Sequence, residues 1–323
     1  MAYDAETTTD QILDGLDLSG RRFVVTGSSS GLGEESARAL AAAGATVTML
    51  ARNPGKNDAA AARVREAVPD ADLELGTVDL ADLASIRSFG AGYLAEHDAI
   101  DVLINNAGVM VCPFGRTVDG FETQFGTNHL GHFLLTALLM PAIRKGDAPR
   151  VVNLSSGGHS ISDVDLVDPN YESTEYDAWS AYGRSKTANV LFTKELARRH
   201  GDELLTFAVH PGVVMTELGR HMDEELMAQM MERMRQRSGD DSESESSGSG
   251  VQIKAVDQGA ATQIWAATSP DLVDHNGAYL GDCQLGVAGG NASHNGYEPY
   301  LDDADKAARL WTLSEELVGE AFP

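Results

Sequence analysis

The feature that most constrains the fold is a glycine-rich stretch, Thr26–Gly33 (TGSSSGLG), which directly follows an apolar run and opens a helical one. In a strand–turn–helix unit of this kind, Gly27 permits the tight turn and Gly31 lets the backbone approach a pyrophosphate. Gly33 lets the helix and the strand pack closely, and the free N–H groups of the first helical turn face the phosphates. This context predicts a dinucleotide-binding loop, and the alternative is a glycine-rich turn that holds no ligand.

Short apolar runs alternate with helical stretches along the rest of the chain. The expected strands are Phe23–Thr26, Thr46–Leu50, Leu73–Val78, Val102–Asn105, Arg150–Leu154, Leu205–Val209 and Ala278–Leu280. The expected helices between them include Gly33–Ala43, Leu83–Glu96, Asn128–Ile143 and Ala181–His200. Gly44 stands where a glycine commonly ends a helix. The alternation predicts an α/β fold, in which residues 1–323 form a single doubly wound Rossmann domain with a parallel sheet of about seven strands and helices on both faces.

The amino-acid composition limits the classes of molecule that the protein is expected to bind. The formal net charge is -25, from 24 Lys+Arg against 49 Asp+Glu, so nucleic acid and anionic membranes are not expected partners. Only six of the basic residues are lysines. An acidic surface of this kind suits high salt, where screening relieves self-repulsion, and we expect a halophilic, haloarchaeal origin. An ordinary acidic cytoplasmic protein is the alternative.

Other classes of protein are disfavoured by what the sequence lacks. Cys112 and Cys283 are far apart, so neither a disulfide framework nor a metal site is expected. Met1–Asp10 is too acidic and polar for a signal peptide. The longest apolar run, around Phe133–Ile143, is far shorter than the roughly 20 residues of a membrane span. A cytoplasmic protein without a membrane partner is expected.

The segment 217–253 follows the sixth expected strand, where a doubly wound sheet binds its ligands. Glu217–Arg237 is expected to be helical, with a stripe at i+4 spacing that consists of Met222, Leu226, Met230 and Met234. Such a stripe is more often plain core, but its position favours a substrate lid. Residues 238–250 contain only serine, glycine and acidic residues, which predicts a disordered insert within the lid.

The end of the second expected strand bears on the choice between NAD and NADP. An NAD site usually has an acidic residue about 20 positions beyond the glycine loop, which binds the ribose 2′-hydroxyl. Thr46–Asn53 contains no acidic residue but does contain Arg52, and a guanidinium can bind a 2′-phosphate in bidentate fashion. We therefore expect NADP, with NAD as the less favoured alternative. The alternative is that Arg52 is a solvated surface charge.

Tyr182 and Lys186 are candidates for the chemistry, because their i, i+4 spacing puts them on one face of a helix. A free tyrosine titrates near pKa 10, and a nearby ammonium is expected to lower that pKa. Tyr182 could then exchange a proton with a carbonyl or alcohol oxygen, while Lys186 donates to ribose hydroxyls. The spacing alone is common in helices, so it needs support from other motifs.

That support comes from the order of the motifs along the chain. The glycine loop is followed by Asn105–Gly108, Ser155–Ser156, Tyr182 with Lys186, and Pro211–Gly212. This order, at these strand ends, resembles the short-chain dehydrogenase/reductase family, and most closely its retinol dehydrogenase and WW-domain oxidoreductase-like branch. The similar stretches include NNAGVMVCP (Asn105–Pro113), AYGRSKTANVLFTKEL (Ala181–Leu196) and VHPGVVMTEL (Val209–Leu218). The resemblance extends over nearly all of Asp17–Val318.

The resemblance implies a catalytic set of Asn128, Ser156, Tyr182 and Lys186. Ser156 would polarise the substrate oxygen, Tyr182 would be the general acid/base, and Asn128 would anchor a water that leads protons to Lys186. Ser155 is expected to point into the core. Cys112 is expected to be structural, and His159 to be a loop residue rather than a catalyst.

The expected cofactor contacts also follow from the resemblance. Asp79 would contact the adenine, and the Val213–Thr216 backbone with the Thr216 hydroxyl would contact the nicotinamide amide and the phosphates. The full expected set is Gly27, Ser29, Ser30, Gly31, Leu32, Gly33, Arg52, Asp79, Leu80, Asn106, Ala107, Gly108, Tyr182, Lys186, Pro211, Gly212, Val214 and Thr216.

The expected function is an NADP(H)-dependent oxidoreductase that acts on an apolar aldehyde, ketone or alcohol, such as a retinol-like molecule. The alternatives are a non-catalytic NADP-binding redox sensor and an NAD-dependent dehydrogenase of the same fold. The membrane anchor of the retinol enzymes and the WW modules are not seen in this sequence, which weakens any transfer of substrate identity. A homodimer or homotetramer, formed through the helices that contain Asn128 and Tyr182, is the expected assembly.

Overall fold

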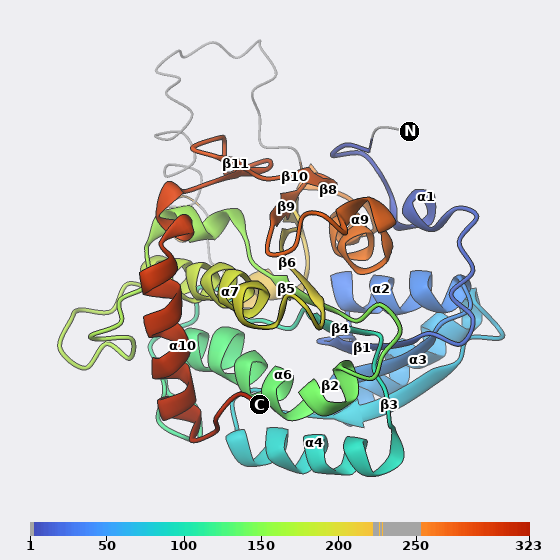
Figure 1. Cartoon of the computed structure of the whole chain (residues 1–323), viewed down its shortest axis with the longest axis horizontal. Coiled ribbons are helices and arrows are strands. Elements are labelled where there is room, and N and C mark those ends of the chain that lie inside the picture. Colours follow the sequence, from blue (N-terminus) through green and yellow to red (C-terminus); the bar gives the residue numbers. More distant parts are fainter. Residues whose placement is uncertain (1–2, 222–225, 227, 229–252) are drawn as a thin grey trace.

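The centre of the molecule is an eight-stranded sheet with the order β10-β9-β6-β5-β4-β1-β2-β3 (Figure 1). The computed structural model describes residues 3–221, 226, 228 and 253–323. All strands of this sheet run parallel except β10, which is antiparallel to β9 at one edge. The strands are β1 (Arg22–Thr26), β2 (Thr46–Ala51), β3 (Leu73–Thr77), β4 (Val102–Asn105), β5 (Arg150–Leu154), β6 (Leu205–His210), β9 (Tyr279–Gly281) and β10 (Gln284–Leu285). The doubly wound parallel sheet is confirmed, with β10 as an additional edge strand.

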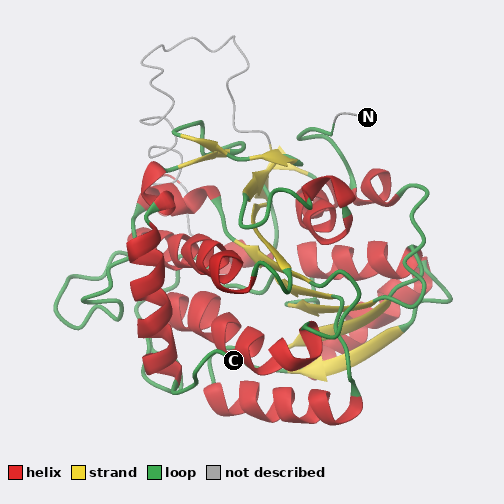
Figure 2. Cartoon of the chain, in the orientation of Figure 1, coloured by secondary structure: helices red, strands yellow, loops and turns green. Residues whose placement is uncertain are grey.

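Helices cover both faces of this sheet (Figure 2). On one side of the sheet lie α2 (Gly31–Ala42), α3 (Pro54–Ala67) and α9 (Val256–Thr268), with α1 (Thr9–Leu13) packed on α9 and α2. On the other side lie α4 (Leu83–Glu96), α6 (Gly131–Ile143) and α7 (Ala178–His200), with α10 (Ala304–Val318) packed on α7. Shorter elements connect these: α5 (Thr123–Phe125), η1 (Gly126–Leu130), η2 (Gly157–Ile161), β7 (Val213–Val214), η3 (Glu217–His221), β8 (Ile253–Lys254), η4 (Pro270–Leu272), β11 (Val287–Ala288), β12 (Gly296–Tyr297) and η5 (Pro299–Asp302).

The central strands are apolar at consecutive positions because both faces of the sheet are buried. In β5, Val151 belongs to the core beneath α6 and α7, and its neighbour Val152 belongs to the core beneath α2 and α9. Both residues have no exposed surface. Successive side chains of a strand point to opposite faces, so a strand buried on both sides needs an unbroken apolar run.

The strand order places the candidate motifs at one edge of the sheet. The order reverses at β1, which pairs with β2 on one side and with β4 on the other, with Val24 opposite Leu103 in the β1–β4 register. In doubly wound sheets, ligands bind outside the carboxyl ends of the strands at this switch point. The glycine loop follows β1 and Asn105–Gly108 completes and follows β4, so both lie at this position.

Three expected helices differ from the observed ones, of which α2 begins two residues earlier and ends one residue earlier than expected. The stretch expected as one helix from Asn128 to Ile143 consists of a π-helical turn, η1, followed by α6. Helix α7 begins at Ala178, three residues earlier than expected, because the Asp177 side chain accepts a hydrogen bond from the Ser180 N–H and caps the helix there. Gly44, with φ +93°, directly follows the C-cap Ala43 of α2, as expected.

The lid expected over 217–253 is described only in part. Residues 217–221 form the 3₁₀ turn η3, and Leu226 and Ala228 are helical. Residues 222–225, 227 and 229–252, which include the three methionines of the predicted stripe and the predicted insert 238–250, lie outside the described residues. Within the part of the chain that the structure describes, no helix is long and apolar enough to cross a membrane.

Candidate active site

The glycine loop joins β1 to α2 with little room for side chains. Gly27 has φ +68°, and a Cβ atom on it would lie 2.8 Å from the Cα of Ala107. A Cβ on Gly33 would lie 2.4 Å from the carbonyl oxygen of Gly27. Since real Cβ atoms do not approach other atoms this closely, only glycine fits at either position.

The start of α2 is open to an anionic ligand. Ser30 is the N-cap residue, but its side chain makes no capping hydrogen bond. The N–H groups of the first helical turn have no acceptors within the helix, and they attract phosphate groups. The loop therefore has both the compact backbone and the free donors that the pyrophosphate of a dinucleotide needs.

Thr26 ties this loop to the strand end of β4. Its hydroxyl oxygen accepts hydrogen bonds from the N–H groups of Asn106 and Ala107, both at 2.9 Å. The Asn106 side chain in turn donates to the Thr26 carbonyl at 2.7 Å. His132, on α6, contacts the same hydroxyl through Nε2 at 2.9 Å. The floor of the candidate cofactor site is thus one hydrogen-bonded unit.

Ser156, Tyr182 and Lys186 meet beside this floor. The Ser156 hydroxyl accepts a hydrogen bond from the Gly158 N–H at 3.1 Å, and a Cβ on Gly158 would lie 2.7 Å from the Tyr182 ring. The Lys186 ammonium lies 5.7 Å from the centre of that ring and donates to the Leu154 carbonyl at 3.0 Å. Ser155 is buried and donates to the Lys186 carbonyl at 3.0 Å, in agreement with its expected inward orientation.

Burial dominates the electrostatics of Tyr182 and Lys186. It raises the pKa of Tyr182 to about 12, and the hydrogen bond with Ser156 offsets only part of that rise. It also lowers the pKa of Lys186 to about 8. The pKa of Tyr182 therefore lies above its usual value rather than below it, because burial penalises the phenolate. The expectation that the Lys186 ammonium favours the phenolate stays a prediction.

Asn128 lies in the π-helical turn η1, and its side chain is already fully bonded. Its amide oxygen accepts from the Val109 N–H at 2.8 Å, and its amide nitrogen donates to the Val109 carbonyl and the Ser185 hydroxyl, both at 2.9 Å. The main-chain carbonyl oxygen of Asn128 lies 2.9 Å from Nδ1 of His132. Asn128 thus fixes the loop after β4 against α7. Its expected role as a water anchor remains a prediction.

Comparisons with known proteins indicate the family in which this arrangement of residues occurs. Residues 21–227 match the family model described as short chain dehydrogenase. The chain belongs to the short-chain dehydrogenase family. Its relatives include the retinol dehydrogenases: it is 39% identical over 305 residues to retinol dehydrogenase 12 of Homo sapiens, which covers 94% of this chain and 88% of that protein. It is 37% identical over 305 residues to retinol dehydrogenase 11 of Mus musculus, with the same coverage of 94% and 88%.

Solved structures agree with the fold. The crystal structure of an uncharacterized protein from Mycobacterium paratuberculosis is similar over 100% of both chains, with 35% sequence identity and a TM-score of 0.73. Levodione reductase, at 21% identity and a TM-score of 0.64 over 81% of this chain and 96% of that one, shares the fold. The Rossmann architecture of this short-chain dehydrogenase is thereby confirmed.

The residues expected to contact the outer parts of the cofactor lie at the ends of β2 and β3. Arg52 directly follows β2 and is exposed. Asp79 lies in the turn after β3, where its side chain accepts a hydrogen bond from the Ala81 N–H at 3.0 Å. Leu80 is buried, and a Cβ on Gly131 of α6 would lie 2.5 Å from its carbonyl oxygen. The structure brings these residues to the same edge of the sheet as the glycine loop.

The segment after β6 completes the candidate cofactor site of this short-chain dehydrogenase. Gly212 follows Pro211 with φ +83°. Val214 pairs with Lys254 in the β7–β8 ladder. The Thr216 side chain lies against the glycine loop, since a Cβ on Gly31 would be 3.2 Å from its methyl group. Cys112 is buried, and burial raises the pKa of its thiol, which agrees with a structural rather than a nucleophilic role.

Sequence reasoning missed four residues that organise the site. Thr26 and His132 bind the floor together, as described above. His159 was expected to be a plain loop residue, but it is completely buried in η2 with its Nδ1 atom 2.6 Å from the Ser156 carbonyl. His210 ends β6 and accepts a hydrogen bond from the Gly157 N–H at 3.0 Å. The one available signal was that both histidines adjoin motifs, His159 after the serine pair and His210 before Pro211.

Proposed function

We propose that this short-chain dehydrogenase transfers hydride between NADP(H) and a carbonyl or alcohol group of an apolar small molecule, with Tyr182 as the general acid/base. The observation that carries the proposal is the convergence of Ser156, Tyr182 and Lys186 beside the glycine loop. A non-catalytic dinucleotide sensor would need the loop but not these three side chains at its edge.

The glycine loop, the first turn of α2 and Thr216 would hold the dinucleotide, with Lys186 beside its ribose. When bound, the nicotinamide supplies or accepts the hydride. The Ser156 oxygen accepts the Gly158 N–H through one lone pair, and its hydroxyl hydrogen can be donated to the substrate oxygen. Tyr182 is protonated at neutral pH because its pKa is about 12, so it can give its proton to the oxygen as a carbonyl is reduced.

Lys186 assists the proton transfer as an ammonium group. Its pKa of about 8 leaves it largely charged at pH 7. The ammonium favours the phenolate that Tyr182 becomes once it has given up its proton. In the reverse direction, the same phenolate takes the proton of an alcohol. The pair therefore supports either direction of the reaction.

The preference for NADP rests on Arg52. This guanidinium is exposed at the end of β2, and the residues from Thr46 to Asn53 include no carboxylate that would bind a ribose 2′-hydroxyl. A guanidinium in this place binds a 2′-phosphate better than it binds a hydroxyl.

The preference for an apolar substrate rests on two loops and on the relatives. Phe114, in the loop after β4, and Met215, in the segment after β7, are exposed large apolar side chains. The Leu218 side chain reaches the site, since a Cβ on Gly108 would lie 3.8 Å from its Cδ1 atom. Several relatives are retinol dehydrogenases, so a bulky apolar aldehyde, ketone or alcohol is the proposed substrate class.

A screen of cofactor oxidation tests this function. The purified protein is assayed in high salt with NADPH or NADH against aldehydes and ketones of increasing apolar size, retinal among them. We expect turnover with NADPH, with kcat/KM rising with apolar size, and a marked loss of NADPH affinity but not NADH affinity in Arg52→Asp. Tight NADPH binding with no turnover across the panel would instead identify a sensor. Equal use of NADH that Arg52→Asp leaves unchanged would contradict the cofactor preference.

A further inference from the structure

Two buried histidines from different parts of the chain hold the turn that contains Ser156. His159 comes from η2 and His210 from the end of β6, and their exposed fractions are 0% and 3%. Nδ1 of His159 lies 2.6 Å from the Ser156 carbonyl oxygen. Nδ1 of His210 lies 3.0 Å from the Gly157 nitrogen. That carbonyl and that N–H belong to the same peptide group, so each of its polar atoms is bound by a different histidine.

The partners fix the tautomer of each ring. A carbonyl oxygen can only accept, so Nδ1 of His159 bears the hydrogen and its Nε2 accepts from the Glu298 N–H at 3.3 Å. His210 has the opposite arrangement, because its Nδ1 faces the N–H groups of Gly157 and Gly212 at 3.0 and 3.3 Å. Nδ1 of His210 must therefore be unprotonated, and its hydrogen is on Nε2.

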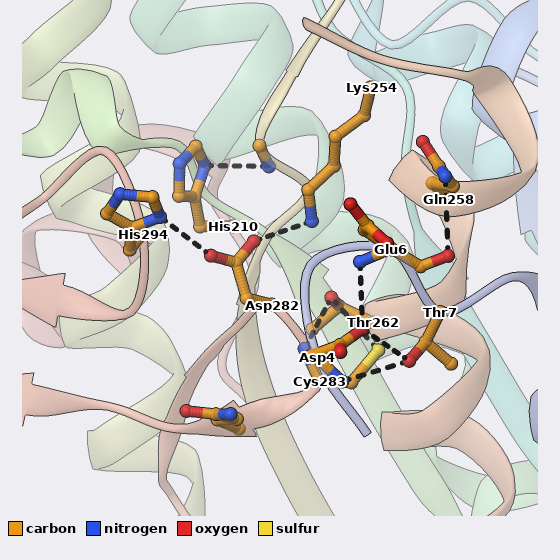
Figure 3. A network of polar contacts seen from close by, with 12 residues as sticks. Asp4, Glu6, Thr7, His210, Lys254, Gln258, Thr262, Asp282, Cys283 and His294 are labelled. Atoms are coloured by element: carbon orange, nitrogen blue, oxygen red, sulfur yellow. Dashed lines mark hydrogen bonds and ion pairs between the residues drawn. The ribbon is translucent and has the colours of Figure 1, made fainter. Parts of the chain in front are cut away.

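The surroundings of His210 keep it neutral. Burial lowers its pKa to about 3. The charged groups next to it are Lys254 and Asp282, which pair with each other at 2.5 Å, and the Asp282 carboxylate also binds His294 at 3.0 Å. Figure 3 shows this carboxylate between the Lys254 ammonium and the His294 ring, with His210 beside them. Lys254 and Asp282 have opposite charges, so their effects on the pKa of His210 oppose each other and the ring stays neutral.

Residues from the C-terminal part of the chain also pack against this turn. A Cβ on Gly157 would lie 2.4 Å from the carbonyl oxygen of Ala292. Tyr300, in η5, donates a hydrogen bond to the His159 carbonyl. The turn is therefore packed between the sheet and a segment far away in sequence, and it has little freedom to shift.

This packing matters because the turn sets the position of two reacting groups. Ser156 begins η2 as its N-cap residue, and the main chain of Gly158 supports the Tyr182 ring. We propose that His159 and His210 are positioning residues, which hold the Ser156–Gly157 peptide group and thereby aim the Ser156 hydroxyl at the substrate oxygen. The inference rests on the proposed function, since it assigns a purpose to that hydroxyl.

Paired substitutions at each histidine test the role. Leucine removes both ring nitrogens, whereas asparagine keeps a polar group at the δ position that can donate or accept. We expect His159→Leu and His210→Leu to lower kcat roughly 10- to 100-fold, since misplacing a reacting group by about 1 Å can cost that much. We expect His159→Asn and His210→Asn to recover most of the rate. For the His159 variants, the NADPH Kd should stay within about threefold of the unaltered value, because only the chemical step is affected.

A double-mutant cycle with Ser156→Ala separates positioning from general damage. If the histidines act mainly through Ser156, His159→Leu and His210→Leu should lower kcat several-fold less in the Ser156→Ala background than in the unaltered enzyme. An undiminished loss in that background would overturn the proposal, as would an unchanged kcat in the leucine variants. If a leucine variant fails to fold, the asparagine variant of that site is compared alone, and a kcat more than about threefold below the unaltered rate would overturn the proposal for that histidine.

Imidazole nitrogen NMR gives a readout that does not depend on turnover. In the ¹⁵N-histidine-labelled full chain at pH 7, His159 should show the Nδ1–H tautomer and His210 the Nε2–H tautomer, assigned through the signals lost in the asparagine variants. The opposite tautomer at either site would overturn the proposed hydrogen bonds to the Ser156–Gly157 peptide group, even if the enzyme is active. Failure of the proposed function would appear differently, as absent turnover in the unaltered protein with both tautomers as stated.

Discussion

At the scale of single residues, the central pair is unusual in that both members are buried. Tyr182 and Lys186 each have 3% exposed surface. Burial moves their pKa values in opposite directions, to about 12 and about 8, because it penalises the charged form of each. Tyr182 is therefore kept as a proton donor, and Lys186 is the member of the pair that titrates nearer to physiological pH.

Lys186→Arg tests this assignment through a pH profile. The ammonium form of Lys186 is complete well below pH 8 and is lost as the pH rises through about 8. We expect kcat for carbonyl reduction to fall above that pH in the unaltered enzyme. In Lys186→Arg the guanidinium stays charged throughout, so the alkaline fall should disappear while the plateau rate drops, since a planar fork is a poor substitute for an ammonium. Ser156→Ala serves as the control, because it should lower the rate but keep the fall near pH 8.

An alkaline fall that stays near pH 8 in Lys186→Arg would show that another group titrates there. The pKa of Lys186 would then have no part in the rate.

At the scale of elements, helix α10 shapes what the protein can assemble into. Its Trp311 side chain is 2% exposed and packs against Phe133 of α6 and Phe192 of α7, with ring centres 5.3 and 5.8 Å apart. Figure 1 shows α10 lying across α7. The expected dimer or tetramer would use the outer faces of α6 and α7, and α10 occupies part of that surface. The dimer or tetramer would therefore have to use the part of α6 and α7 that α10 leaves open. It stays a prediction, which the mass of the protein by light scattering would check.

Trp311→Ala should expose how much α10 contributes to stability. Truncating a buried tryptophan leaves a cavity, and the expected loss in the free energy of unfolding is about 3–5 kcal/mol. Chemical denaturation followed by circular dichroism measures it. Trp265 is the matched control position, since it is also a largely buried tryptophan but lies in α9 on the opposite face. If Trp311→Ala costs less than about 1 kcal/mol, α10 is not packed as described.

The elements also show what could be predicted from the sequence. The seven expected strands are present with ends displaced by at most one residue, because strands such as Val102–Asn105 are continuous apolar runs with clear ends. The π-helical turn at Asn128 could not be predicted, since a break in the helix register there depends on tertiary contacts. One such contact is the close packing of Gly126 against Thr117, whose methyl would lie 2.5 Å from a Cβ on Gly126.

The residues of the candidate site also fall into those that could be predicted from the sequence and those that could not. Gly27, Ser156, Tyr182 and Lys186 could be found from motif order, because each follows a strand or lies on a helix face at a fixed spacing. The pKa of Tyr182 could not, because it depends on burial that three-dimensional packing creates. His159 and His210 could not be paired either, since 51 positions separate them and only the fold brings both to one peptide group.

At the scale of the whole molecule, the formal net charge of -25 is the dominant physical feature. Like charges on a compact surface repel each other, and salt screens that repulsion over about 8–10 Å at moderate ionic strength and about 3 Å at 1 M. We expect Tm to rise by at least about 5 °C between dilute buffer and molar salt, which for a domain of this size is roughly 3 kcal/mol.

Differential scanning calorimetry in a salt series measures that shift. Sucrose at equal osmolality is the control, because an uncharged solute does not screen charge. A flat response to salt, or an equal response to sucrose, would discard the expected adaptation to high salt.

In the proposed NADPH-dependent reaction, Tyr182 exchanges the proton with the carbonyl oxygen of the substrate. The most direct measurement compares Tyr182→Phe with the unaltered chain, using the best carbonyl substrate of the screen in high salt. Phenylalanine keeps the ring packed against Gly158 and removes only the hydroxyl group. We expect a loss of kcat of at least roughly 100-fold, the usual contribution of a general acid, with the NADPH Kd and the Tm nearly unchanged. Turnover at the unaltered rate in Tyr182→Phe would contradict this role of Tyr182.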